Sequence, residues 1–498
     1  MVHTAGMNSP SLNIGLFYPP RLTYRGRMKK ISNSRVKTIT PEQIKELKLK
    51  CRVYEESGPV PVLISIVLPT FNNGNELYTT TLTNIIGEVS KLIDDGVVDE
   101  LLIVDGSRKK GKPDYEFIKF LLSVCISRCN TFAKEVEFVK SLPEGKQKAM
   151  QGRFDFSVRF LSQMDATMQK IFLKHNLLSE DEVWALNKGK GAGLWYSIPV
   201  TYGHILCFVD SDIRSFDVSY ILSLCKPILD SWKSDRKGGI SKPGVVFTKA
   251  YYTRKNETEK DFKMGGRLCR MGARPLFSAL SKQGVFTGLD KVKYPVSGEF
   301  AFAIDQLKGI QFSNGYDIEA SMLCQLWKKF GMDKTTQVEF GVYQHIPGSE
   351  GHVRDMFKEM SNAILYWASQ YEIRGKINEE LLEKEFVSEG KELTKEYKKT
   401  AKSLEGFGYT IEDKKKDLKR LKSFSSTLKK LLSQPHSSPK LLKAWKDIEI
   451  KANQELEYSY QNLKITLRKR INKFTSDVIF SHIFLDKSDE IIKKYTGE

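Results

Sequence analysis

Short apolar runs alternate with helical patterns along the first half of this chain. The segments Val62–Pro69, Leu101–Val104 and Ile205–Val209 are almost entirely apolar. Continuous runs of this length are typical of strands that are buried on both faces of a parallel sheet. The stretch 76–94 instead places its apolar residues at helical spacing. Strands that alternate with helices predict an α/β fold with a mostly parallel sheet flanked by helices.

The same pattern predicts further elements. A short helix is expected after Thr40, which can cap it, because Pro41 suits the first helical position and Gln43 completes a capping box. Other helices are predicted near 114–130, 150–175 and 218–229, and another strand at 244–248.

Composition divides the chain into three predicted parts. Residues 1–60 form a basic N-terminal arm with a short helix, and residues 61–355 carry the alternating strands and helices. Residues 356–498 are rich in Lys and Glu, with breaks near 406–408 and 433–439. A charged helical appendage is therefore expected there, and its charge runs are typical of solvated helix faces.

Charge narrows the range of partners. Lys plus Arg total 79 against 60 for Asp plus Glu, a net charge of +19 over 498 residues. Such an excess suits nucleic acid, anionic lipid or phosphorylated small molecules. The chain shows no zinc-finger spacing and no aromatic RNA-binding segment, so no nucleic-acid partner is expected. No apolar stretch is long enough to span a bilayer, but the basic tail keeps a peripheral membrane contact open.

The cysteines indicate a reducing compartment. There are 7, an odd number, and Cys207 and Cys225 fall inside apolar runs. A disulfide framework is therefore not expected, and a cytoplasmic location is. Cys125 and Cys129 lie four residues apart without a second ligand pair, which favours core packing over a metal site.

Two carboxylates, Asp210 and Asp212, directly follow the apolar run that ends at Val209. Ligands of open α/β sheets bind at the carboxyl ends of the strands. A divalent cation there, Mg²⁺ or Mn²⁺, would bridge a carboxylate to a diphosphate and offset the repulsion between them. On its own, the pattern also fits a strand followed by an acidic turn.

Polar residues also follow the first two strands. Pro69, Thr70 and Asn73 offer backbone and amide groups for a base and a ribose, and Asp105 and Ser107 flank a glycine at the next strand tip. Each group alone is common in turns. In succession with the acidic pair, they predict one crevice at one sheet edge.

A glycine-rich loop at 187–193 carries Lys190. Glycine lets a backbone approach closely, and lysine supplies a point charge for phosphate. The loop lacks the Gly-Lys-Ser/Thr ending of a Walker motif, and a flexible surface loop is the alternative.

The order of these segments resembles that of nucleotide-sugar glycosyltransferases of the A-type, Rossmann-like fold. Within them, residues 62–355 are most similar to the retaining glucosyl-3-phosphoglycerate synthases. The resemblance is carried by a set of ordered segments, which are Val67–Asn73, Ile103–Ser107, Gly189–Trp195, Phe208–Asp212, Gly265–Arg267, Ala273–Pro275, Ser297–Glu299, Gly315–Glu319 and Gly341–His345. It implies that 61–355 is a catalytic domain, that the chain is a UDP-sugar-dependent transferase, and that it forms a homodimer.

For the donor, the resemblance implies that Pro69, Thr70 and Ser107 line the uridine pocket, beside Asn73 and Asp105. Lys190 would contact the nucleotide. Asp212 and a distant His345 would hold the metal ion, with Asp210 close to the ribose and sugar. The donor and metal roles imply UDP-glucose together with Mg²⁺ or Mn²⁺. The resemblance thus implies that the nucleotide is bound by Pro69, Thr70, Asn73, Asp105, Ser107, Lys190, Gly266 and Tyr343, and the metal ion by Asp212 and His345.

For the acceptor, the resemblance implies that Glu299 holds sugar hydroxyls and that Gly266 and Arg267 bind the phosphate or carboxylate of a small anionic acceptor. An arginine beside glycines combines a bidentate donor with open backbone amides. The chain departs from the family here. Cys269 stands where the family shows threonine, Tyr343 where it shows arginine, and Pro347 where it shows asparagine. Because these departures fall in the acceptor and phosphate-binding region, the resemblance predicts the donor better than it predicts the acceptor.

The resemblance predicts retaining transfer of glucose to 3-phosphoglycerate or glycerate, with catalytic contributions from Asp210, Asp212, Glu299 and Arg267. One alternative is an inverting transferase of the same fold that acts on a lipid-linked or polysaccharide acceptor. It needs a carboxylate base, for which Glu299 or Glu319 is available. Another alternative is a catalytically silent nucleotide-binding module.

Overall fold

The computed structural model describes most of the chain beyond residue 31. The described ranges are 32–34, 39–55, 58–72, 74–109, 111–150, 152–186, 189–233, 242–257, 262–346, 350–403, 407–408, 410–434, 437–455 and 459–483. Most of the predicted basic arm, Asn73 and Pro347 lie outside them.

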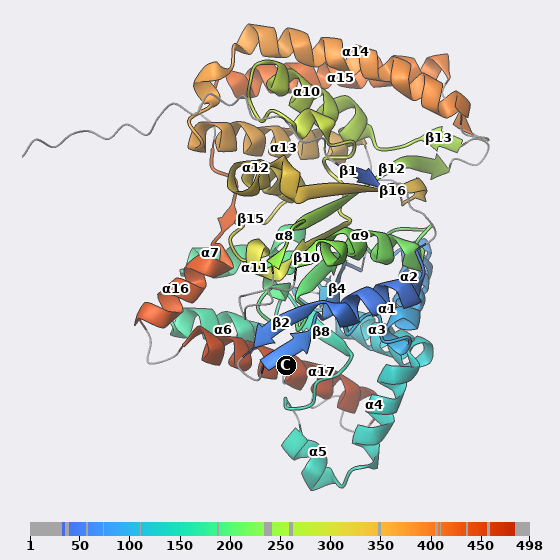
Figure 1. Cartoon of the computed structure of the whole chain (residues 1–498), viewed down its shortest axis with the longest axis vertical. Coiled ribbons are helices and arrows are strands. Elements are labelled where there is room, and N and C mark those ends of the chain that lie inside the picture. Colours follow the sequence, from blue (N-terminus) through green and yellow to red (C-terminus); the bar gives the residue numbers. More distant parts are fainter. Residues whose placement is uncertain are drawn as a thin grey trace, which may run out of the picture. The chain divides into compact units, whose positions relative to one another are not determined.

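A central sheet organises this part of the chain (Figure 1). Its order is β1-β16-β12-β14-β9-β4-β5-β8, with β13 and β17 attached beside β12. The bounds are β1 Ser32–Ser34, β4 Ile64–Thr70, β5 Glu100–Asp105, β8 Val158–Ser162, β9 Ile205–Phe208, β12 Phe247–Glu257, β13 Phe262–Met264, β14 Phe300–Ala303, β16 Thr335–Gln344 and β17 Phe407–Gly408.

The sheet is mostly parallel. Strands β9, β4, β5 and β8 run parallel to one another, and β12 runs parallel to β16. Strand β14 runs antiparallel between β9 and β12. Because Thr70 pairs with Asp105 and Asp105 pairs with Ser162, the carboxyl ends of three parallel strands are level. The predicted α/β fold is confirmed.

Both faces of the sheet are covered, as the continuous apolar runs predict. In β4, Ile64, Ile66 and Leu68 belong to one core, together with helices α2 (Glu76–Asp94), α3 (Tyr115–Arg128) and α9 (Val218–Asp230). Val67 faces the opposite core, which includes α8 (Lys190–Ser197), α10 (Arg274–Lys282) and α12 (Ile318–Phe330). Alternate side chains of one strand therefore anchor two helical layers.

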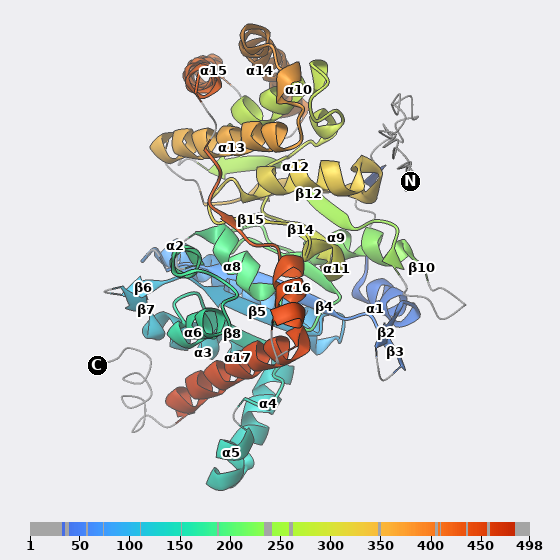
Figure 2. The same ribbon diagram turned by 90° about the vertical axis from the view of Figure 1, so that its left-hand side faces the viewer.

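The helices after residue 350 pack against this core in two groups. Helix α14 (Glu379–Ser403) packs on α10, and α15 (Ile411–Leu432) packs on α14 and on α13 (Glu350–Gln370). Helix α13 also packs on α12 and crosses the predicted boundary at 355. Helix α17 (Tyr460–Ile483) returns to β8, α3 and α6 (Ala166–Lys174), as Figure 2 shows. The helical character of the C-terminal region is confirmed, whereas the three-part division stays a prediction.

Several predicted elements match, and others need correction. Helix α1 (Pro41–Lys50) has the expected capping box, with Thr40 accepting from the Gln43 amide. The predicted helix at 150–175 is wrong, because β8 interrupts it before α6. Arg159 interrupts the apolar pattern of this strand, and its side chain is buried and forms an ion pair with the buried Glu100. The strand predicted at 244–248 begins at Phe247 and runs to Glu257.

The remaining helices and short strands surround the two cores. The helices are α4 Asn130–Ser141, α5 Glu144–Met150, α7 Glu180–Leu186, α11 Ile304–Leu307 and α16 Trp445–Glu455. The short strand pairs are β2 Arg52–Glu55 with β3 Gly58–Pro61, β6 Arg108–Lys109 with β7 Lys112–Pro113, β10 Trp232–Lys233 with β11 Lys242–Pro243, and β15 Phe312–Ser313 with β18 Leu441–Leu442. All 7 cysteines are buried free thiols. Among the described helices, none has the length and apolar character needed to cross a bilayer.

Candidate active site

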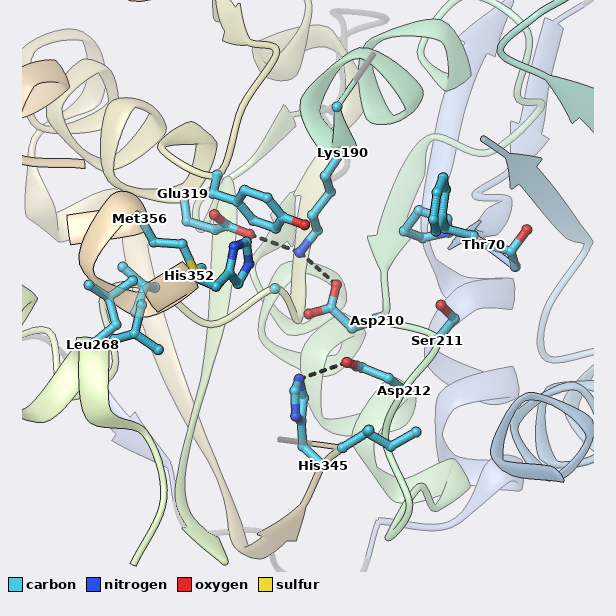
Figure 3. A pocket seen from close by; sticks show the side chains of 18 of the residues that line it. Thr70, Lys190, Asp210, Ser211, Asp212, Leu268, Glu319, His345, His352 and Met356 are labelled. Carbon is cyan, nitrogen blue, oxygen red and sulfur yellow. Dashed lines mark hydrogen bonds and ion pairs between the residues drawn. The ribbon is translucent and has the colours of Figure 1, made fainter. Parts of the chain in front are cut away.

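A cavity of about 730 Å³ opens above the carboxyl ends of β4, β5 and β9. It is lined by eight of the predicted site residues, which are Pro69, Thr70, Lys190, Asp210, Asp212, Gly266, Arg267 and His345. Four other predicted residues, Asp105, Ser107, Glu299 and Tyr343, are buried around it. The sheet order brings these residues together from segments far apart in the sequence (Figure 3).

The side chains of Asp212 and His345 meet just beyond the carboxyl end of β9. The Asp212 Oδ2 atom lies 2.8 Å from the His345 Nε2 atom. The backbone fixes this approach, because Ile213 forms a bridge with His345 and the Ile346 amide donates to the Asp212 carbonyl at 3.2 Å. Burial alone would raise the pKa of Asp212, but His345, Arg254 and Lys190 outweigh it and hold that pKa below its usual value. The carboxylate is therefore ionised at neutral pH.

This pair fits a divalent cation that is shared with a ligand. Within the described ranges, no group of three His, Cys, Asp or Glu residues is arranged to hold a metal ion. Two protein ligands are in keeping with Mg²⁺ or Mn²⁺ sites, in which phosphate oxygens and water complete the coordination. The chemistry of the donor set thus suits an ion that binds together with a diphosphate.

Lys190 lies between two carboxylates. Its Nζ atom is 2.6 Å from Asp210 Oδ1 and 2.9 Å from Glu319 Oε1. Helix α8 starts at Lys190, directly after Gly189. Only glycine fits at position 189, because its φ is +90° and a Cβ there would lie 1.8 Å from the Asn314 carbonyl oxygen. Burial would lower the pKa of Lys190, but the two acids raise it well above its ordinary value, so the ammonium stays charged.

Glu299 is buried and held by two tyrosines. The Tyr343 hydroxyl donates to Oε1 at 2.6 Å and the Tyr252 hydroxyl to Oε2 at 2.9 Å, while the two rings stack with centroids 3.8 Å apart. The preceding Gly298 allows Asp210 to come close, since a Cβ there would lie 2.2 Å from its Oδ2. Burial, and then the charge of Asp210, raise the pKa of Glu299 to about 7 against the opposing effect of the Tyr343 hydroxyl.

The raised pKa predicts a pH-dependent effect of Glu299→Gln on stability. Above its usual pKa of 4.5 the unfolded chain loses this proton while the folded protein keeps it, so wild-type stability falls as pH rises from 4.5 to about 7. We expect the variant to gain about 3 kcal/mol over wild type at pH 8 and almost nothing near pH 4.5. Urea unfolding at both pH values measures this. An equal difference at both would contradict the raised pKa.

Asp105 and Ser107 lie buried beneath the wall of the cavity that the ends of β4 and β5 form. Ser107 Oγ donates to Asp105 Oδ1 at 2.6 Å, Thr70 Oγ1 donates to the same atom at 2.9 Å, and the Asn72 amide donates to Ser107 Oγ at 2.6 Å. Burial raises the pKa of Asp105 to about 7, against these hydrogen bonds. The network holds the Pro69–Asn72 turn in place. Pro69 and Thr70 line the cavity, whereas Asp105 and Ser107 do not.

Residues that the sequence did not single out also line the cavity. They include Tyr78, Tyr252, Arg254, Tyr294, His352 and Met356. Tyr252 and Arg254 lie on β12 beyond its predicted end, at a shift of register between Tyr251 and Thr253. A longer strand prediction with polar residues at its far end would have pointed to them. His352 and Met356 come from α13, and no local pattern places that helix here.

Comparison with known proteins gives a partial match. No protein-family model matches this chain. Glucosyl-3-phosphoglycerate synthase of Mycolicibacterium smegmatis is 33% identical over 159 residues, which make up 32% of this chain and 47% of that protein. The protein of the same name from Mycobacterium tuberculosis is 26% identical over 287 residues, or 57% of this chain and 66% of that protein. The chain thus spans about half to two thirds of the length of these relatives.

A solved structure is also similar. The crystal structure of glucosyl-3-phosphoglycerate synthase from Mycobacterium tuberculosis, in complex with Mn²⁺, uridine diphosphate and glucosyl-3-phosphoglycerate, is 22% identical. The match covers 68% of this chain and 88% of that chain, with a TM-score of 0.45. The sequence matches confirm the predicted resemblance to glucosyl-3-phosphoglycerate synthases.

Proposed function

We propose that this chain is a metal-dependent glycosyltransferase. It moves a sugar, glucose from UDP-glucose, to a small anionic acceptor such as 3-phosphoglycerate or glycerate. The observation that carries the proposal is the Asp212–His345 pair, 2.8 Å apart at the end of β9 and facing the cavity that Lys190 lines. The resemblance in sequence to proteins named glucosyl-3-phosphoglycerate synthase supports it.

On this proposal, Pro69 and Thr70 line the place of the uridine. Asp212 and His345 hold a Mg²⁺ or Mn²⁺ ion, which neutralises charge on the departing diphosphate when it is bound. Lys190, charged and fixed by Asp210 and Glu319, adds a second positive group at the same place. Positioning and electrostatics of this kind lower the barrier by several kcal/mol.

The acceptor lies beside Gly266 and Arg267 in this proposal. Both line the cavity, and the Arg267 guanidinium is suited to a phosphate or carboxylate. The sugar–phosphate bond breaks and the acceptor oxygen bonds to the anomeric carbon. The acceptor proton passes to the leaving phosphate oxygen on the same face of the sugar, so the transfer retains configuration. No protein base is needed for this step.

The arrangement of the carboxylates supports retention over inversion. An inverting transferase requires a free carboxylate base that faces the acceptor. Glu319 is bound to Lys190, and Glu299 accepts from Tyr343 and Tyr252 through its two oxygens. Glu299, with a pKa near 7, is the stronger candidate base if the reaction inverts.

A screen of donors against acceptors tests the proposal. The protein is incubated with Mg²⁺ or Mn²⁺ and a series of UDP-sugars, with phosphoglycerate, glycerate and lipid phosphates as acceptors, and mass spectrometry reads the products. Glucosylated phosphoglycerate or glycerate with an α-linkage, assigned by NMR, is expected. A β-linked product from UDP-α-glucose contradicts retention. Tight UDP binding without any transfer or hydrolysis contradicts the enzyme and favours a silent binding module.

We also propose a homodimer in a reducing, cytoplasmic setting. The buried free cysteines are in keeping with a reducing compartment, and the dimer rests on the resemblance alone. A peripheral membrane contact through the basic C-terminal helices is part of the lipid-acceptor alternative.

A further inference from the structure

Arg254 stands where two cavities meet. It lines the active-site cavity and a neighbouring cavity of about 290 Å³ whose wall includes Arg270, Arg274 and Lys293. On β12 it pairs in register with Tyr343 of β16, the position at which the resembling family has an arginine. The sheet therefore places Arg254 beside Tyr343, the residue that stands where the family has an arginine.

The Arg254 guanidinium contacts the Nδ1 atom of His345 through Nη2. A guanidinium only donates hydrogen bonds, so Nδ1 accepts here. The hydrogen of a neutral imidazole then sits on Nε2 and points at Asp212 Oδ2, 2.8 Å away. The two contacts together hold His345 in the form that cannot offer Nε2 to a metal ion.

A cation at the Asp212–His345 pair needs the lone pair of Nε2. The imidazole hydrogen must then lie on Nδ1, where it would face the donor group of Arg254. Metal-bound histidines ordinarily donate their other N–H to a carboxylate, a carbonyl or water, which is the opposite of the arrangement here. Arg254 and a metal ion therefore compete for His345 through its two nitrogens.

The guanidinium also has an unused donor. Within the described residues, its buried Nε atom has no hydrogen-bond partner, and the Tyr294 hydroxyl lies beside the guanidinium. Arg254 is also one of the positive groups that lower the pKa of Asp212. A cation at Asp212 and His345 would repel the guanidinium, and an anionic ligand in the cavity that Arg254 lines would accept hydrogen bonds from it.

We infer that Arg254 is a positioning residue that couples the metal ion to the anionic substrate. Without a cation at the pair, Arg254 donates to Nδ1 of His345. With the cation present it turns to an anionic oxygen of the ligand, so that each of the two ligands favours the other. The inference rests on the proposed function, because it takes Asp212 and His345 as the metal pair.

Arg254→Gln distinguishes the effect on metal binding from the effect on UDP binding, because we expect it to strengthen the first and weaken the second. Mn²⁺ alone should bind the variant about twofold to tenfold more tightly than wild type, because no guanidinium competes for His345. UDP in the presence of Mn²⁺ should bind about tenfold or more weakly, because a charge-assisted hydrogen bond is lost. Electron paramagnetic resonance of free Mn²⁺ and titration calorimetry with UDP measure these values.

Two matched variants complete the test. Arg254→Lys keeps the charge without the planar fork and should restore part of the UDP affinity, and it replaces Arg254→Gln if that variant does not fold. Lys255→Gln, next along β12 and lining neither cavity, should bind both ligands like wild type. Weaker Mn²⁺ binding in Arg254→Gln, or unchanged UDP binding, overturns the inference and leaves the proposed function standing. If wild type binds UDP but no Mn²⁺, the metal pair and the inference both fail.

Discussion

Replacing Asp212 with alanine is expected to lower the rate of sugar transfer by about a thousandfold or more without unfolding the protein. Asp212 supplies the only carboxylate that touches His345 Nε2 in the described structure, at 2.8 Å. A metal ion stabilises the charge of a leaving group by several kcal/mol, and each 1.36 kcal/mol corresponds to about a factor of ten in rate. Steady-state rates with UDP-glucose and the acceptor found in the screen measure the loss.

The control for this variant is Asp181→Ala. Asp181 is an exposed acid on α7, away from the cavity lining, and its removal should leave the rate unchanged. Circular dichroism confirms that both variants fold. Asp210→Ala should also be slow, because it removes a partner of Lys190. Rates close to wild type in both Asp210→Ala and Asp212→Ala contradict the metal assignment.

Lys190→Met is expected to weaken both the fold and nucleotide binding. The substitution removes the ammonium that separates the carboxylates of Asp210 and Glu319, which are respectively 23% and 7% exposed. Leaving one side of such a pair uncompensated costs about 3 kcal/mol at neutral pH. Urea unfolding at pH 7.5, with UDP titration calorimetry, measures both effects.

Lys174→Met provides a matched comparison. Lys174 is exposed at the end of α6 and outside the cavity, so its loss should change neither stability nor UDP affinity. If Lys190→Met behaves like Lys174→Met in both measurements, Lys190 does not have the role that its two ion pairs assign to it.

The sequence predicts the part of the fold in which local pattern and tertiary burial agree. Strands β4, β5 and β9 are apolar on both faces because helices cover both sides, and their runs are visible without the structure. Strand β8 was missed because Arg159 interrupts its apolar pattern. The pairing with Glu100, 59 residues away, together with hydrogen bonds to Asn472 and to the Val200 carbonyl, explains how that charge is buried.

For the candidate site too, the sequence predicted the residues that belong to a local pattern and missed those that only the tertiary fold brings there. Asp210, Asp212 and Lys190 were found because each follows a recognisable strand end or glycine-rich loop. His345 came from resemblance alone, since no local pattern distinguishes it. Arg254 and Tyr252 were missed because the predicted strand ended at residue 248, whereas β12 runs to Glu257. Their place beside His345 also depends on the lateral order of β12 and β16, which the sequence does not reveal.

We propose that Asp212 and His345 together hold a divalent cation against the diphosphate of a nucleotide sugar. Anomalous diffraction from crystals grown with MnCl₂ and UDP shows directly where the ion binds. We expect one manganese peak within about 2.0 to 2.3 Å of a carboxylate oxygen of Asp212 and of Nε2 of His345, with a phosphate oxygen completing the contact. UDP bound in the cavity with the manganese elsewhere, and Asp212 still bonded to His345, would contradict it.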